Sequence, residues 1–475
     1  MKYENLQIKL PFEVLQIHSI SFDAKLNKHS LCCIEALIEE DKAEEYFRQD
    51  NYGKSMKVST PDEVIFAGKC RKLRILYRDH SAILEVQAVS YTYELDIREH
   101  SRVFMDTGMT YKELIQSVLQ PYGRAECVNT PQKEAKLEQV IVQYKETDWE
   151  FLKRIGSHFG RVLVADSKEK AIRFYFGLPD KNIPIESQNT VKKSIADFYA
   201  FRNRKSLSNE KTNQNHFLRW SVESKQYIPL GMQLIFEGKK AAVTKIHMKS
   251  KQGEVIYNYS LQIVSGIKKS YQSNSKIKGV SLEAIVKKVH KNSMQVHFCM
   301  GDAYDDKEGN AWFPYVRETG DFYYMPASES KVHIYFPTEH EEMAYVTHCL
   351  HTADKAAPNY NRIAEPANKS LSTKEGQALL LTKDAITVSG NQENQVQLTL
   401  GKNGTVSVKG KTITLQSTQT FHLGNPKPYH VVSNKGKVKS IEISAKKEII
   451  LSSGAGQMIE LRDEAHMYGI VRINE

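Results

Sequence analysis

The last hundred residues place the strongest constraint on the fold. From residue 376 to 475, apolar and polar residues alternate over short stretches that end at glycine, serine or asparagine turns. Alternation with a period of two predicts β-strands that are apolar on one face only. Strands this short cannot build a core alone and have to stack on neighbours. The candidate core positions are Val396, Leu398, Leu400, Val406, Val408, Ile413, Leu415, Ile441, Ile443, Ile459 and Leu461.

Two kinds of neighbour fit this pattern. Successive strands of the same chain would give a solenoid or a meander, and the same strands of two other chains would give a three-sided prism. A triangular β-helix buries all of its apolar faces and leaves no sheet edge free along its length. The periodicity alone does not choose between them.

The rest of the chain predicts several mainly β domains. A length of 475 residues exceeds what one hydrophobic core organises. Strand patterns dominate, with an α+β block in the first half and five short strands, typical of a small barrel of the oligonucleotide/oligosaccharide-binding (OB) type, before the tail. The expected segments are 1–95 (β-barrel-like), 96–200 (α+β), 201–275 (second β domain), 276–352 (OB-type barrel), 353–375 (linker) and 376–475 (β-helical spike).

Composition narrows the function. The net charge is +10, but lysine and arginine are scattered, so we expect no nucleic-acid partner. The six cysteines show no C-x-x-C spacing, which argues against a zinc ribbon and a disulfide framework. No secretory signal and no apolar run of membrane-spanning length is visible, so we expect assembly in the cytoplasm.

Two helix starts carry capping signatures. Thr110 is followed three residues later by Glu113, and Thr147 by Glu150. The acidic residues Asp148 and Glu150 then lie at the positive end of a helix dipole, and Trp149 can pack inside the domain. This favours a structural role for them over acid–base catalysis.

Catalytic signatures are missing from the sequence. It contains no G-x-S-x-G, H-E-x-x-H, G-x-x-x-x-G-K-[ST] or G-x-G-x-x-G pattern. The acidic stretch 302–308 fails the spacing of a calcium loop. We therefore expect a protein that is not an enzyme and has no cofactor.

One segment near residue 150 and another near residue 320 resemble a known family. Residues 142–155 match its Q-Y-x-E-T-D-W-x-F-[LI]-x-R pattern, and residues 312–336 are similar to its small barrel. The family is that of the spike proteins of contractile injection systems: phage late-control hub proteins and type VI valine-glycine-repeat spike proteins. The matching positions are Gln143, Tyr144, Glu146, Thr147, Asp148, Trp149, Phe151, Arg154, Trp312, Arg317 and Pro326. The order hub, barrel and β-stem also agrees with the family.

The resemblance implies a homotrimer with a trimeric β-helix or prism at its C-terminus. Its hub domains would form a pseudo-sixfold platform between a tail tube and a membrane-piercing spike. Implied partners are tail-tube and baseplate proteins, a tip-capping protein or effector, and the envelope of the target cell, reached from within an injection particle. In a trimer, one histidine near the axis would supply three imidazoles, which suit iron or zinc, and His466 is the candidate for such a tip metal.

Two other functions stay open. A spike-borne cell-wall hydrolase would need an added domain with paired carboxylates, for which the stretch 353–384 is too short. A glycan- or peptidoglycan-binding surface module would use the α+β block, which occurs once.

Overall fold

The computed structural model divides the chain into two units, Met1–Thr352 and Ala353–Glu475. It describes residues 6–51, 53–78, 81–131, 135–180, 191–199, 201–202, 213–251, 254–300, 309–316, 324–350, 365–373, 375–390, 396–414, 418, 449–452, 458–461 and 465–468. Within these ranges, no helix has the length and apolar character needed to cross a membrane.

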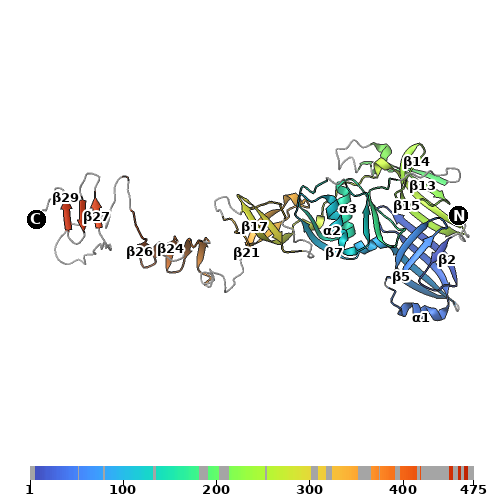
Figure 1. Cartoon of the computed structure of the whole chain (residues 1–475), viewed down its shortest axis with the longest axis horizontal. Helices are drawn as coiled ribbons and strands as arrows, with labels where there is room; N and C mark the ends of the chain where they lie inside the picture. Colours follow the sequence, from blue (N-terminus) through green and yellow to red (C-terminus); the bar gives the residue numbers. More distant parts are fainter. Residues whose placement is uncertain are drawn as a thin grey trace. The chain divides into compact units, whose positions relative to one another are not determined.

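The described residues are mainly β-structure with few helices, as expected from the sequence. The helices α1 (Glu40–Arg48), α2 (Tyr111–Leu119) and α3 (Asp148–His158) all lie in the first unit (Figure 1). The predicted capping boxes are present: Thr110 with Glu113 begins α2, and Thr147 with Glu150 begins α3.

The largest sheet has eleven strands and combines strands from residues 7–90 with strands from residues 191–263. Strand β2 pairs antiparallel with β15, with Ala24 opposite Ile246. The segments expected as separate domains at 1–95 and 201–275 therefore share one sheet and one apolar cluster, and in the described residues its strand order is an open path. The strand order is β1 (Gln7–Lys9), β4 (Ser55–Ser59), β5 (Val64–Arg78), β6 (Ser81–Ser90), β3 (Leu31–Ile38), β2 (Gln16–Lys25), β15 (Lys239–Lys251), β16 (Glu254–Ile263), β13 (Leu218–Ser224) and β12 (Val191–Ala196), with β14 (Gln233–Phe236) on β15.

An α+β part lies between the two halves of this sheet in sequence. Its strands are β7 (Glu99–Phe104) paired with β9 (Ile141–Thr147), and a small sheet in the order β10 (Leu163–Ala165), β11 (Ile172–Phe176) and β8 (Ala125–Val128). Helices α2 and α3 bury their apolar faces against these strands. Trp149, Phe151 and Phe174 are fully buried in the resulting core.

A five-stranded sheet completes the first unit. Its order is β19 (Phe313–Pro314), β18 (Ser293–Phe298), β17 (Ser281–His290), β20 (Lys331–Tyr335) and β21 (Tyr345–Leu350). A bridge between Tyr315 and Val346 brings its two end segments together. Its core also contains Val103 and Val142 from β7 and β9, so this sheet and the α+β part share buried side chains.

The second unit consists of two antiparallel meanders in its described residues. One runs in the order β22 (Lys369–Ser372), β23 (Ala378–Leu381), β24 (Ala385–Ser389), β25 (Gln397–Gly401) and β26 (Val406–Lys409). The other runs in the order β27 (Ile449–Ser452), β28 (Met458–Leu461) and β29 (Ala465–Tyr468). Leu415, Ile441 and Ile443 lie outside the described residues. Ile459 and Leu461 lie on β28 and His466 on β29, where only the backbone is described.

Candidate functional site, a buried ion network at helix α3

The segment 142–154, in which the sequence suggested a family motif, forms strand β9 and the first turns of α3. Asp148, the first residue of α3, is completely buried. Its Oδ1 accepts hydrogen bonds from Arg102 Nη1 at 2.8 Å and from Gln143 Nε2 at 2.9 Å. Its Oδ2 accepts one from Tyr122 Oη at 2.7 Å. A carboxylate at a helix N-terminus with three donors has its charge fully compensated.

A second group of charges surrounds Arg154, nearly two turns further along α3. Its Nε and Nη2 donate to the two carboxylate oxygens of Glu146 at 3.0 and 2.8 Å. Its Nη1 donates to Glu341 at 3.0 Å, across 187 positions of sequence. All three side chains are buried. The guanidinium therefore joins the α+β part to the residues that lead into β21.

Asn274 adds a neutral donor to the same group. Its Nδ2 donates to Glu146 Oε2 and to the backbone oxygen of Tyr144, both at 3.2 Å. Burial raises the pKa of Glu146, and the charge and hydrogen bonds of Arg154 oppose that rise. The pair is thus held in a nearly dry environment, where breaking one partner is costly.

The start of α3 also contacts the first strands of the chain. Thr147 Oγ1 donates to Asp96, whose other oxygen lies 3.3 Å from His29 Nε2. The His29 ring packs 4.6 Å from that of Trp149, whose Nε1 donates to the backbone oxygen of Asn27 at 3.3 Å. Burial lowers the pKa of His29, so this ring is neutral near pH 7.

Most of the motif residues named from the sequence meet here. Phe151 stacks on Phe104 with ring centroids 5.6 Å apart. In the other segment, Pro326 is buried, Trp312 is 45% exposed beside His290, and Arg317 lies outside the described residues. Sequence reasoning missed the partners Arg102, Tyr122, Asn274 and Glu341, because nothing in a local pattern indicates a contact so distant in the chain.

The arrangement offers little chemistry. Each charged group of the network is occupied by a protein partner and shielded from solvent, so no acid, base or nucleophile faces a substrate. Among the described side chains, no group of three histidine, cysteine or acidic residues could hold a metal ion. The His466 side chain is outside that set, so its tip metal stays a prediction.

Comparisons with known proteins support a structural reading of this fold. No protein-family model matches the chain, and no curated protein does. The chain does superimpose on the Escherichia coli c3393 protein with a TM-score of 0.54 at 13% identity, over 72% of this chain and 98% of that one. That protein is a component of the type VI secretion system, with structural similarity to the T4 bacteriophage tail proteins gp27 and gp5. This chain shares the fold of that protein over the aligned part.

A second solved structure extends the match. A chain of the Francisella PdpA–VgrG complex in its half-lidded form aligns with a TM-score of 0.50 at 8% identity, over 85% of this chain and 87% of that one. The resemblance to spike and hub proteins inferred from residues 142–155 and 312–336 is thereby confirmed at the level of the fold. Within this fold, the buried network links strand β9 and helix α3 to Glu341, which precedes β21.

Proposed function

We propose that the chain is the hub and spike of a contractile, phage-tail-like injection machine and acts mechanically as a homotrimer. The observation that carries this proposal is the five-stranded sheet β22–β26, which has an uncovered apolar face and no core of its own. Among the residues of the second unit whose burial the structure describes, all of them between 365 and 418, only Gly376, Ala378 and Ser389 are buried. The spike fold supports the same conclusion.

The apolar face is continuous because the strand register places apolar residues of neighbouring strands opposite one another. Leu379 lies opposite Val388, Val388 opposite Leu398, and Leu398 opposite Val408. Positions two residues apart share a face, so a second row runs parallel to the first. The two rows are Leu371, Leu379, Val388, Leu398 and Val408, and Leu381, Ile386, Leu400 and Val406, each between 37% and 67% exposed.

The other face of the sheet is mostly polar. Thr387, Thr399 and Ser407 occupy it on three successive strands. A sheet with one apolar and one hydrated face buries the apolar one against a partner. Three identical sheets around a common axis would cover all three apolar faces at once. We therefore assign residues 376–475 to a trimeric β-prism, with Val396, Ile413, Leu415, Ile441, Ile443, Ile459 and Leu461 among its inner positions.

The first unit contains two groups of strands that could contact a tail tube. Its eleven-stranded sheet contains two groups of strands from one chain, β1–β6 and β12–β16, joined at β2 and β15. Three chains would present six such groups, which suits contact with a sixfold tail tube. We assign residues 1–95 and 201–275 to these barrel-like groups, 96–200 to the α+β part, 276–352 to an OB-type barrel and 353–375 to a linker.

The buried network gives this hub mechanical stiffness. Arg154 connects Glu146 to Glu341 inside the protein, so the α+β part and the barrel cannot slide past each other without exposing unpaired charges. Sheath contraction would load this junction directly. The partners in this account are tail-tube and baseplate proteins, a tip-capping protein or effector, and the target envelope.

Purified particles from the producing cells test the proposal. Quantitative mass spectrometry should find three copies of the chain per contractile particle, and cells lacking the chain should make no complete particles. Normal particles assembled without the chain would contradict the proposed role.

A further inference from the structure

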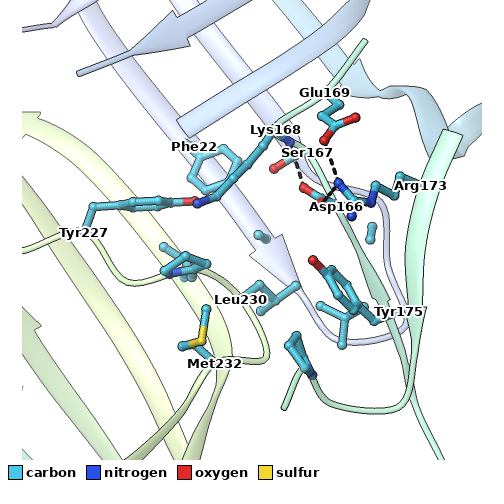
Figure 2. Close-up of a pocket in the computed structure, with 16 residues that line it drawn as sticks. Phe22, Asp166, Ser167, Lys168, Glu169, Arg173, Tyr175, Tyr227, Leu230 and Met232 are labelled. Atoms are coloured by element: carbon cyan, nitrogen blue, oxygen red, sulfur yellow. Dashed lines mark hydrogen bonds and ion pairs between the residues drawn. The ribbon is translucent and has the colours of Figure 1, made fainter. Parts of the chain in front are cut away.

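A cavity in the first unit lies apart from the ion network and has no part in the proposed mechanics. Its volume is about 240 Å³, and four stretches of sequence line it (Figure 2). They are strand β2, the residues from β10 to just after β11, the loop before β14, and strand β15. The cavity therefore sits where the two halves of the large sheet meet the small sheet of the α+β part.

The inner wall of the cavity is apolar. Val164, Leu230, Met232 and Ile246 line it. Figure 2 shows the rings of Tyr227 and Tyr175 on opposite sides, with the Tyr175 hydroxyl directed toward Asp166. A narrow space with aromatic sides and an aliphatic wall accommodates an unbranched apolar stem.

The polar end of the cavity contains one incompletely satisfied carboxylate. The side chain of Asp166 is only 10% exposed. Its Oδ1 accepts a hydrogen bond from the backbone nitrogen of Lys168 at 3.0 Å. Its Oδ2 lies 3.9 Å from Arg173 Nη1, which is too far for a hydrogen bond.

The cations near Asp166 have closer partners. Arg173 lies 2.5 Å from Glu169 and 3.2 Å from Glu126, and Lys168 lies 2.6 Å from Glu63. Asp166 and Glu169 line the cavity together with Lys168 and Arg173, whereas Glu63 and Glu126 pair with these two cations from outside the lining. Because other carboxylates hold both cations at 3.2 Å or less, Asp166 is the carboxylate of the lining without a close cation, and a positive ligand would neutralise it.

The two tyrosines provide further acceptors. Neither hydroxyl has a hydrogen-bond partner among the residues described by the structure. Burial, followed by nearby carboxylates, raises the pKa of both groups, so both stay protonated and neutral. A neutral phenol oxygen can accept a hydrogen bond. The ring of Tyr227 already faces a cation, because Lys168 Nζ lies 5.3 Å from its centroid.

We propose that this cavity binds a primary alkylammonium group. The stem would pack along Leu230 and Met232, and the ammonium would donate to Asp166 Oδ2 and to the tyrosine hydroxyls. The same chemistry belongs to a free alkylamine and to the lysine side chain of a partner protein. A carboxylate or phosphate ligand would instead be repelled by Asp166.

Calorimetric titration of the full-length protein at pH 7 tests the proposal. We expect n-pentylamine to bind at least tenfold more tightly than 1-pentanol, which has the same stem without the charge. N-acetyl-lysine-N-methylamide separates the sources: binding similar to that of the amine supports a partner's lysine, and its exclusion supports a free amine. Equal binding of amine and alcohol, or binding of neither, would overturn the proposal.

Variants locate the ligand. Asp166→Asn should weaken amine binding at least tenfold and leave alcohol binding unchanged. Asp180→Asn, which removes the same charge from an exposed side chain outside the cavity, should bind like the wild type. If Asp166→Asn lowers the melting temperature, Tyr175→Phe with Tyr227→Phe serves instead, with a several-fold loss expected. Unchanged affinity in the folded variants, or an equal loss in Asp180→Asn, would place the ligand elsewhere.

Discussion

The two units of the chain treat apolar surface in opposite ways. In the first unit, large side chains such as Trp149, Phe174 and Tyr257 have no exposed surface. In the sheet β22–β26 of the second, leucines and valines on one whole face are between a third and two thirds exposed. This difference indicates that the first unit buries its apolar side chains within one chain, whereas the sheet of the second unit needs a partner surface to cover its apolar face.

The two units also differ in whether they bury charged side chains. The first unit can bury Arg154, Glu146 and Glu341 together because its cores are large enough to exclude water around them. The described strands of the second unit have no interior in which to place a charge. In our account, rigidity comes from buried ion pairs in the first unit and from contact between copies in the second.

The largest effect should come from charging the apolar face of the stem. Leu398→Asp combined with Leu400→Asp places two carboxylates where the copies would meet, and burying each unpaired charge costs several kcal/mol. We expect the trimer to dissociate, as measured by light scattering. Thr399→Asp adds a charge on the opposite face of the same strand and should leave the trimer intact. A stable trimer from the double variant would show that the apolar face of the second unit does not hold the copies together.

The next largest effect should be a loss of stability in the first unit when its buried cation is removed. Arg154→Met leaves Glu146 and Glu341 buried without their cation, and such a loss destabilises a protein by about 3–5 kcal/mol. Urea unfolding followed by tryptophan fluorescence should show the midpoint falling. The control is Arg48→Met, because Arg48 pairs with Glu44 on the surface, where an ion pair contributes about 0.5 kcal/mol or less. Equal urea midpoints for Arg154→Met and Arg48→Met would mean that the buried ion pairs stabilise the protein no more than the surface pair does.

A smaller effect should appear as a pH dependence of the hub. The His158 ring stacks on Tyr271 and faces Tyr111 and Arg154, and burial followed by the Arg154 charge lowers its pKa from 6.5 to about 4. Because the folded pKa is the lower one, this contribution is complete above pH 6.5 and is lost as the pH falls toward 4. At pH 5 the loss amounts to about 2 kcal/mol.

His158→Phe isolates this term because it keeps a ring for stacking and cannot take up a proton. The melting temperature of the wild type should fall faster between pH 7 and pH 5 than that of the variant. The assembly of the stem should not respond to the same substitution. Parallel pH profiles for the two proteins would show that His158 is not held neutral by the fold.

Local features of the fold were predictable from the sequence. The capping boxes at Thr110 and Thr147 mark the starts of two helices because a cap needs only residues three positions apart. The alternation around Val388, Leu398 and Val408 predicted one-faced strands for the same reason. The sequence also placed Asp148 at the start of a helix and Trp149 inside the domain, although it did not indicate the complete burial of Asp148.

Long-range partners were not predictable. The pairing of β2 with β15 joins residues more than two hundred positions apart, and a period of two does not say which strands are neighbours. The contact between Arg154 and Glu341 and the position of Asn274 likewise leave no local pattern. The cavity at Asp166 was missed because its lining comes from four separate stretches of the chain.

The mass of the full-length protein in solution tests the central claim most directly. Light scattering should return three times the chain mass of 54.3 kDa at micromolar concentration. A well-folded species of 54.3 kDa that persists at the same concentration would contradict a stem built from several copies.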